Sequence, residues 1–195
     1  MNSILKSKTP PHTVAEYLSW DDEERWELIA GVAYNMSPAP TIKHQDIALN
    51  LGSLLRARLK GKPCKPFIAP VDVVLSDHDV VQPDALAVCD PTKITPKNIQ
   101  GAPDFVLEVL SPSTSRKDMR EKKALYERAG VAEYLVLDPL ELYALLFRLD
   151  AEGRYGAGEV YGPEESLVLQ ILGGEAVDLA EVFELGGESA SPDLA

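Results

Sequence analysis

The spacing of apolar residues divides the first third of the chain into helical and extended segments. Thr13 lies three residues before Glu16, a capping-box spacing that predicts the start of a short helix. Two β-prone runs flank Ala30-Gly31 and predict a β-hairpin. From His44 the apolar residues recur at helical spacing as far as Gly61, which predicts a longer helix.

Apolar, β-branched runs fill the middle of the chain and predict the strands of a sheet. A helix is predicted between the third and fourth runs, and Gly130 is placed to end it. Shorter apolar runs follow and predict strands near the sheet edge and a last short helix. The main strands are predicted over 67–75, 80–88, 105–110 and 134–137, the helix over 116–129, the later strands over 142–149, 160–161 and 167–172, and the last helix over 177–183. This order predicts an α/β (α+β) fold, a mixed sheet flanked by helices.

Size and composition fit one globular domain. The 195 residues are 45% hydrophobic and 26% charged, which is ordinary for such a domain. We expect a domain over 13–185, a tail over 1–12 and a disordered acidic tail over 186–195. No apolar run reaches the ~20 residues of a membrane span, and the start lacks the apolar region of a secretory signal, so we expect a cytoplasmic protein without membrane contact. Cys64 and Cys89 are too few for a disulfide framework and are expected to be reduced and buried.

The net charge of −12 is concentrated in the last third of the chain. Residues 1–130 hold 17 basic and 17 acidic side chains, whereas residues 131–195 hold 2 basic and 14 acidic ones. An acidic total disfavours nonspecific binding to nucleic acid. A local basic face can still bind it, and two short runs, within 56–65 and 116–123, hold ten of the basic residues.

Three acidic residues stand within the predicted strands: Asp72, Asp84 and Glu108. Central strands are apolar on both faces, so each buried carboxylate needs a cation, a hydrogen-bond donor or a proton. A separate structural partner for each carboxylate is one explanation. Three like charges on neighbouring strands repel each other, however, and a divalent cation such as Mg²⁺ would relieve that repulsion.

Lys122 stands near the middle of the apolar side of the helix predicted over 116–129. At about 100° per residue, Lys123 points instead toward solvent. The Lys122 ammonium either extends to water along the helix surface or reaches the carboxylates on the neighbouring strand. In the second case it can orient an attacking water and stabilise a phosphate in its transition state. Carboxylates that bind a metal beside one lysine suit phosphodiester hydrolysis.

Four short segments of the chain are distinctive when they occur in one order. They read ELIAG over 27–31, VQPD over 81–84, EVLSPST over 108–114 and GVAEYLVLDP over 130–139. In this order they resemble the Uma-type restriction endonuclease family of the PD-(D/E)XK nuclease superfamily. The resemblance spans roughly Thr13 to Phe183.

This resemblance implies a restriction-endonuclease-like fold and a site that uses Mg²⁺ or Mn²⁺. Asp84 and Glu108 would be metal ligands, with the Val109 carbonyl as a third, and Glu27 would complete the site. The superfamily's usual lysine, two residues after Glu108, is absent here. Lys122 matches the position in the following helix to which the family has moved that lysine.

Three more residues are candidates for substrate contact or for support of the site. His44 matches a family position, although a histidine at the start of a helix is commonly a capping or packing residue. Asp72 is the third acidic residue of the strands. Ser111 lies in the strand-to-helix loop, where it contacts phosphate or caps the helix. Asp118 is interpreted as a first-turn acid favoured by the helix dipole.

Two functions of different class fit these residues. The first is a metal-dependent endonuclease acting on DNA, with Glu27, Asp84, Glu108 and Lys122 as catalytic residues; a phosphatase or an RNase would share the site. The second is a noncatalytic dimeric binding or regulatory module on a degenerate nuclease fold, which the acidic balance favours. Because two related sites cut both strands most simply, we expect a homodimer, with the strands over 142–149 and 167–172 as its surface.

Overall fold

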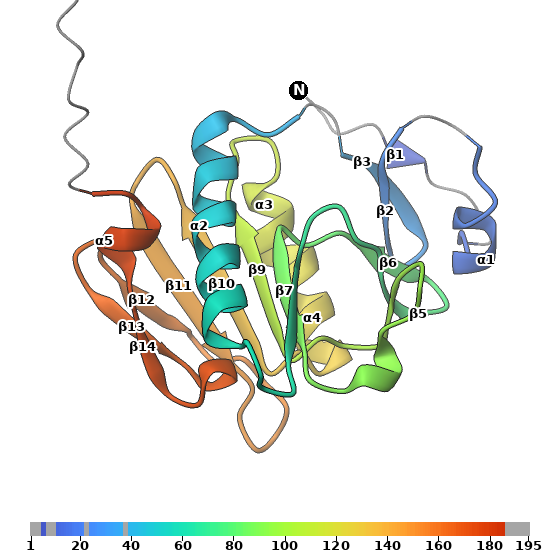
Figure 1. Cartoon of the computed structure of the whole chain (residues 1–195). Helices are drawn as coiled ribbons and strands as arrows, with labels where there is room; N and C mark the ends of the chain where they lie inside the picture. The colour runs from blue at the N-terminus through green and yellow to red at the C-terminus, as the bar shows by residue number, and fades with distance from the viewer. Residues whose placement is uncertain (1–4, 7–10, 22–23, 37–38, 186–195) are drawn as a thin grey trace, which may run out of the picture.

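The computed structural model describes residues 5–6, 11–21, 24–36 and 39–185. In this part of the chain there are two six-stranded sheets and a two-stranded ribbon, with helices packed against them (Figure 1). Both large sheets mix parallel and antiparallel neighbours. The predicted fold class, mixed sheets flanked by helices, is therefore confirmed, although the strands are shared between two sheets rather than one.

The N-terminal sheet has the strand order β1-β3-β2-β6-β5-β8. Its strands are β1 (Leu5–Lys6), β2 (Trp26–Ile29), β3 (Val32–Asn35), β5 (Val73–Ser76), β6 (Asp79–Val81) and β8 (Ile99–Gln100). Strands β2 and β3 form the predicted hairpin. Helix α1 (Val14–Tyr17) begins after Thr13, whose side chain forms the predicted capping box with Glu16.

The central sheet has the strand order β12-β11-β10-β9-β7-β4, in which only β9 and β10 are parallel neighbours. Its strands are β4 (Lys65–Ile68), β7 (Ala85–Val88), β9 (Phe105–Val109), β10 (Glu133–Asp138), β11 (Tyr143–Arg148) and β12 (Glu159–Tyr161). A ribbon of β13 (Ser166–Leu169) and β14 (Glu175–Asp178) follows, and then helix α5 (Leu179–Val182).

Two helices cover opposite faces of the central sheet (Figure 1). Helix α2 (Ile42–Arg58) packs Leu51 and its neighbours against one face, and α4 (Lys123–Ala129) packs Tyr126 against the other. Strand side chains alternate between faces, so Leu107 of β9 joins the α2 side while Glu108 points toward α4. Before α4 the chain forms α3 (Ser115–Lys117) and a π-helical turn (Asp118–Lys122). None of the described helices is long and apolar enough to span a lipid bilayer.

Two of the predicted strands are broken, and their halves belong to different sheets. The run 67–75 divides into β4 and β5, and the run 80–88 divides into β6 and β7. Each break contains a proline, Pro70 or Pro83, which cannot donate to a strand ladder. The prediction that Asp72 and Asp84 lie inside strands is therefore wrong, because both lie in these breaks. Glu108 lies inside β9, as predicted.

The ends of the chain differ in part from the prediction. Residues 5–6, assigned to a tail, form β1 and pair with β3. Residues 1–4 and 7–10 of that tail, and the predicted tail over 186–195, lie outside the described residues. The last predicted helix, over 177–183, is the end of β14 followed by the shorter α5.

The late apolar strands pack inside the chain. Strand β11 lies between β10 and the edge strand β12, near the sheet edge as predicted, and Leu145, Leu146 and Phe147 are buried. The run 167–172 forms β13 and a 3₁₀ turn, with Leu167 buried as well. Most apolar side chains of these two segments are therefore buried within the chain, whereas Val168 stays exposed.

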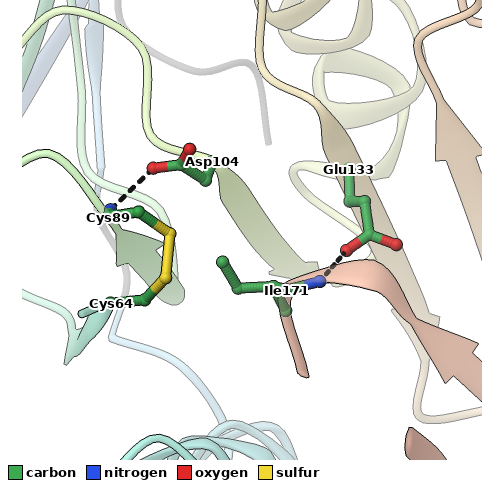
Figure 2. Close-up of a disulfide and its surroundings, with 5 residues drawn as sticks. All are labelled: Cys64, Cys89, Asp104, Glu133 and Ile171. Carbon is green, nitrogen blue, oxygen red and sulfur yellow. Dashed lines mark hydrogen bonds between the residues drawn. A yellow bond between two sulfur atoms is a disulfide. The ribbon is translucent and has the colours of Figure 1, made fainter. Parts of the chain in front are cut away.

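A disulfide joins Cys64 and Cys89, so the expectation of two reduced thiols is wrong (Figure 2). Lys65 pairs with Val88 in the antiparallel β4–β7 ladder, and the next position outward brings the two cysteines opposite each other. A count of cysteines cannot reveal this pairing, because it depends on the register of two strands. The N–H of Cys89 also donates to Oδ2 of Asp104, at 2.7 Å.

Buried Glu133 ties the ribbon to the central sheet. Its two carboxylate oxygens accept the N–H groups of Gln170 and Ile171, each at 2.9 Å, and Figure 2 shows the second of these bonds. Arg148 lies 3.3 Å from the same carboxylate and supplies the opposite charge. These contacts satisfy a carboxylate that would otherwise be costly to bury.

Candidate active site

Lys122 is buried among carboxylates where the two large sheets and the α3–α4 region meet. Its side chain is 3% exposed, and its Nζ lies 2.7 Å from Oε1 of Glu27 on β2 and 2.8 Å from Oε1 of Glu108 on β9. Asp118, at the start of the π turn, lies 3.8 Å from the same nitrogen. The ammonium therefore reaches the strand carboxylates and does not extend to water.

Glu27 is fully buried, and donors occupy both of its carboxylate oxygens. Oε1 accepts from Lys122 and from the N–H of Gln82, the latter at 3.1 Å. Oε2 accepts from Lys117 Nζ at 2.6 Å. Two cations therefore hold one carboxylate in place.

This cluster holds more carboxyl groups than ammonium groups, so their pKa values shift in different directions. Burial alone would raise the pKa of Glu27, but the attraction of Lys122 and Lys117 outweighs it and lowers that pKa from 4.5 to about 2. Burial raises the pKa of Glu108 well above its usual value, and the negative charges of the neighbouring carboxylates raise it further. The attraction of Lys122 opposes this rise but does not outweigh it. Lys122 stays protonated, since the same carboxylates raise its pKa well above normal despite its burial. Burial also raises the pKa of Asp118, so the cluster disfavours a full set of negative charges in the absence of another cation.

Asp84 and Glu108 are brought together by the pairing of β7 with β9. Ala85 pairs with Leu107, so Asp84, which directly precedes β7, lies near the neighbouring Glu108 of β9. The charge of Asp84 is one of those that raise the pKa of Glu108. Oδ2 of Asp84 accepts the N–H of Val109 at 2.8 Å.

His44 lies beside Asp84, one of the three metal ligands that we expected. Its Nε2 is 3.3 Å from Oδ2 of Asp84. Burial opposes protonation of this ring, but the neighbouring Asp84 carboxylate outweighs that effect and raises the pKa of His44. His44 therefore packs in the first turn of α2 and also contacts the candidate site.

Each of the two facing carboxylates keeps one oxygen without a donor in the described part of the chain. Lys122 and Tyr126, the latter at 2.6 Å, both donate to Oε1 of Glu108, which leaves Oε2. The contacts of Asp84 with Val109 and His44 both involve Oδ2, which leaves Oδ1.

This donor set fits a hard divalent cation. The described residues contain no group of three His, Cys, Asp or Glu side chains arranged for a metal ion. Mg²⁺, however, takes only one or two carboxylates and fills its other positions with water and substrate oxygens. Asp84 and Glu108, with the Val109 carbonyl, would meet that requirement.

The other predicted residues lie farther from the reacting groups. Asp72 accepts from Tyr17 Oη at 2.9 Å and from Gln82 Nε2 at 2.8 Å, so it supports the residue that donates to Glu27. Ser111 Oγ accepts the N–H of Thr114 at 3.2 Å and bonds to hydroxyls of its own loop. Ser111 therefore orders the loop that precedes α3.

Three residues of the cluster were missed by sequence reasoning. Asp118 lies in the first turn of the π-helical segment, as expected, but it is 2% exposed and its place beside Lys122 was not expected. Tyr126 is fully buried and donates to Glu108; its spacing of four residues from Lys122 was a readable signal. Lys117 was not recognised as a site residue because a regular α-helix would point it away from Lys122. The π turn, which changes that direction, was not predicted.

The comparisons with known proteins agree with this fold. The family model of Uma2, described as "Putative restriction endonuclease", matches residues 14–180. The uncharacterized protein slr1290 of Synechocystis sp. is 26% identical over 148 residues, which cover 74% of this chain and 77% of that protein. A crystal structure described as a putative nuclease belonging to DUF820, from Anabaena variabilis, has a TM-score of 0.74 at 21% identity and covers 89% of this chain and 98% of its own. Because the family model matches most of its length, the chain belongs to the Uma2 family.

Proposed function

We propose that this chain is a Mg²⁺- or Mn²⁺-dependent endonuclease that hydrolyses phosphodiester bonds of DNA. The observation that supports this best is the buried Lys122 ammonium between Glu27 and Glu108, with Asp84 facing Glu108. Burying an ion cluster costs several kcal/mol per ion before the charges attract each other, so it is a costly way to build a core. The description of the family and the name of the DUF820 protein add support for a nuclease.

Asp84, Glu108 and the Val109 carbonyl would hold the metal ion. When bound, such an ion polarises the scissile phosphate and stabilises the leaving oxygen. His44 and the N–H of Val109 both contact Oδ2 of Asp84, so this carboxylate is oriented before an ion arrives. Tyr126 does the same for Glu108 through its hydrogen bond to Oε1.

Lys122 is placed to act on the nucleophile in this proposal. It stays protonated and lies within hydrogen-bond distance of Glu108, so it can orient a water beside the ligand carboxylates. Glu27 fixes the lysine by binding it from the opposite sheet. An ammonium held in this way also offers a fixed positive charge to the developing negative charge of the phosphate.

The noncatalytic alternative draws its support from the net charge of −12. The negative excess, however, begins after residue 130, whereas residues 27–126, which build the cluster, hold 13 basic and 11 acidic side chains. The acidic total therefore does not describe the neighbourhood of the site. A homodimer with two sites remains our proposal for cutting both strands.

Plasmid cleavage tests the proposed function. Purified protein is incubated with supercoiled plasmid in Mn²⁺, in Mg²⁺ and in chelator, in parallel with Asp84→Asn and with single-stranded DNA and RNA. We expect nicked and linear plasmid with metal, none with chelator, and none with Asp84→Asn. Cleavage that persists in the variant or in chelator would contradict the assigned site. Saturable plasmid binding with no cleavage under any condition would support the noncatalytic module.

A further inference from the structure

Lys117 is a second lysine at the site, and it is more accessible than Lys122. Its Nζ lies 2.6 Å from Oε2 of Glu27, and its side chain is 13% exposed, compared with 3% for Lys122. The same ammonium lies 5.5 Å from the centre of the Tyr34 ring. Lys117 therefore lies between the buried cluster and the surface.

The π turn explains how two lysines five residues apart reach one carboxylate. In a regular α-helix, at about 100° per residue, Lys117 and Lys122 would point about 140° apart. The turn over Asp118–Lys122 closes with bonds to the fifth residue, so a side chain five positions on returns to nearly the same side. Turns of this kind occur frequently at functional sites.

The two ammonium groups differ in how many donors they keep. An ammonium has three N–H donors. Lys122 directs two of them to Glu27 and Glu108, at 2.7 and 2.8 Å, and Asp118 lies 3.8 Å away, so one donor remains for the water. For Lys117, Glu27 is the one carboxylate within 4.0 Å in the described part of the chain, so donors remain for another anion.

We propose that Lys117 is a catalytic residue that contacts a nonbridging oxygen of the scissile phosphate, while Glu27 positions both lysines and is not a metal ligand. The inference rests on the proposed nuclease function, because it assigns the phosphate of that substrate. Both oxygens of Glu27 are occupied by N–H donors, which leaves them poorly placed to bind a cation. A lysine with one anchored and two free donors suits a phosphate that arrives from solvent.

The salt dependence of DNA affinity tests this contact without relying on turnover. Affinity for a labelled duplex is measured by fluorescence anisotropy over a series of salt concentrations, in chelator and again in Ca²⁺. Each phosphate contact contributes about one to the slope of log affinity against log salt. We expect Lys117→Ala to lower the magnitude of that slope by about one and to weaken binding, and Lys117→Arg to restore most of it. An unchanged slope in both conditions, or no duplex binding by the wild type in either, would overturn the proposal.

Lys123→Ala is the matched control on the same helical segment. Its ammonium lies 4.3 Å from the centre of the Phe147 ring, away from Glu27, so the slope should match that of the wild type. The double variant Glu27→Gln with Lys117→Gln is compared with the single variant Glu27→Gln. The difference between their salt slopes separates the two possible roles of Lys117. If Lys117 only neutralises Glu27, its removal changes nothing in the Glu27→Gln protein, and the proposal fails. If it contacts phosphate, the slope still falls.

Cleavage by the wild type keeps the two hypotheses distinguishable. If the wild type cleaves plasmid and Lys117→Ala has a cleavage rate within twofold of it and the same salt slope, the role of Lys117 is overturned. The nuclease proposal then stays intact. A wild type that cleaves nothing contradicts the nuclease proposal itself. Thermal unfolding of each variant is recorded, and Lys117→Met, which keeps the aliphatic stem on Tyr34, replaces the alanine variant if that protein does not fold.

Discussion

The ammonium of Lys122 lies 2.8 Å from Oε1 of Glu108, 14 residues earlier in the chain. The strand supplies the carboxylate, and the π turn supplies the lysine. The wheel pattern of the helix predicted that this lysine points inward. The structure adds Glu27 from the other sheet as a second partner, so the ammonium links three elements that are distant in sequence.

Lys122→Gln should abolish most of the cleavage and preserve the fold. Glutamine keeps a donor for Glu108 but removes the charge beside the attacking water and the phosphate. We expect the rate of plasmid nicking in Mn²⁺ to fall by about 10²- to 10³-fold, the usual loss when one donor to a developing negative charge is removed. Lys123→Gln, one residue later, should nick at the rate of the wild type. Equal rates for Lys122→Gln and the wild type would remove Lys122 from the mechanism.

Glu27→Gln should destabilise the protein at neutral pH. The pKa of Glu27 in the folded protein is about 2, below 4.5 for the free side chain, so its charge stabilises the fold above pH 4.5. That contribution, about 3 kcal/mol, is lost as the pH falls from 4.5 toward 2. Urea unfolding at pH 7 and at pH 3 measures it, and the gap between wild type and variant should shrink at the lower pH. A gap that widens toward acid pH would contradict this sign.

Glu108→Gln should have the opposite effect on stability. The pKa of Glu108 is raised in the folded protein, so keeping it ionised costs free energy as the pH rises above 4.5. Glutamine removes that cost and can still accept from Tyr126. We expect a higher melting temperature than that of the wild type in chelator at pH 8, together with a loss of cleavage. A lower melting temperature would mean that the ion pair with Lys122 outweighs the burial cost.

The Cys64–Cys89 disulfide should affect stability without affecting the chemistry. It closes a loop with a sequence separation of 25, for which chain entropy gives about 3 kcal/mol of stabilisation. Cys89 follows β7 and Asp84 precedes it, so the bond and the site lie at opposite ends of that strand. The double variant Cys64→Ser with Cys89→Ser should unfold at lower urea concentration and nick plasmid at the wild-type rate at 25 °C. A slower rate in the folded variant would show that the bond shapes the site.

The main elements and the site carboxylates could be predicted from the sequence because they depend on local pattern. Glu108 is conspicuous inside an apolar run, and Lys122 inside an apolar helical side. What could not be predicted depends on pairing or on irregular geometry. The division of one expected sheet into two follows from the breaks at Pro70 and Pro83, which hydrophobic runs alone obscure.

The register of β4 with β7 decides the disulfide, and no local pattern encodes it. The π turn decides which side of the helix Lys117 takes, since the prediction assumed a regular 100° step. Glu133 was not singled out, because a carboxylate that accepts two backbone N–H groups from a distant turn looks like any surface acid in the sequence.

Calorimetric titration with Mn²⁺ and Mg²⁺ tests the central claim, a cation site made by Asp84 and Glu108, most directly. The wild type, Asp84→Asn, Glu108→Gln and the control Lys123→Gln are titrated at the same pH. We predict saturable binding by the wild type and by the control, weakened at least tenfold in both carboxylate variants. Absence of binding to the wild type, or equal affinity in all four proteins, would contradict the account.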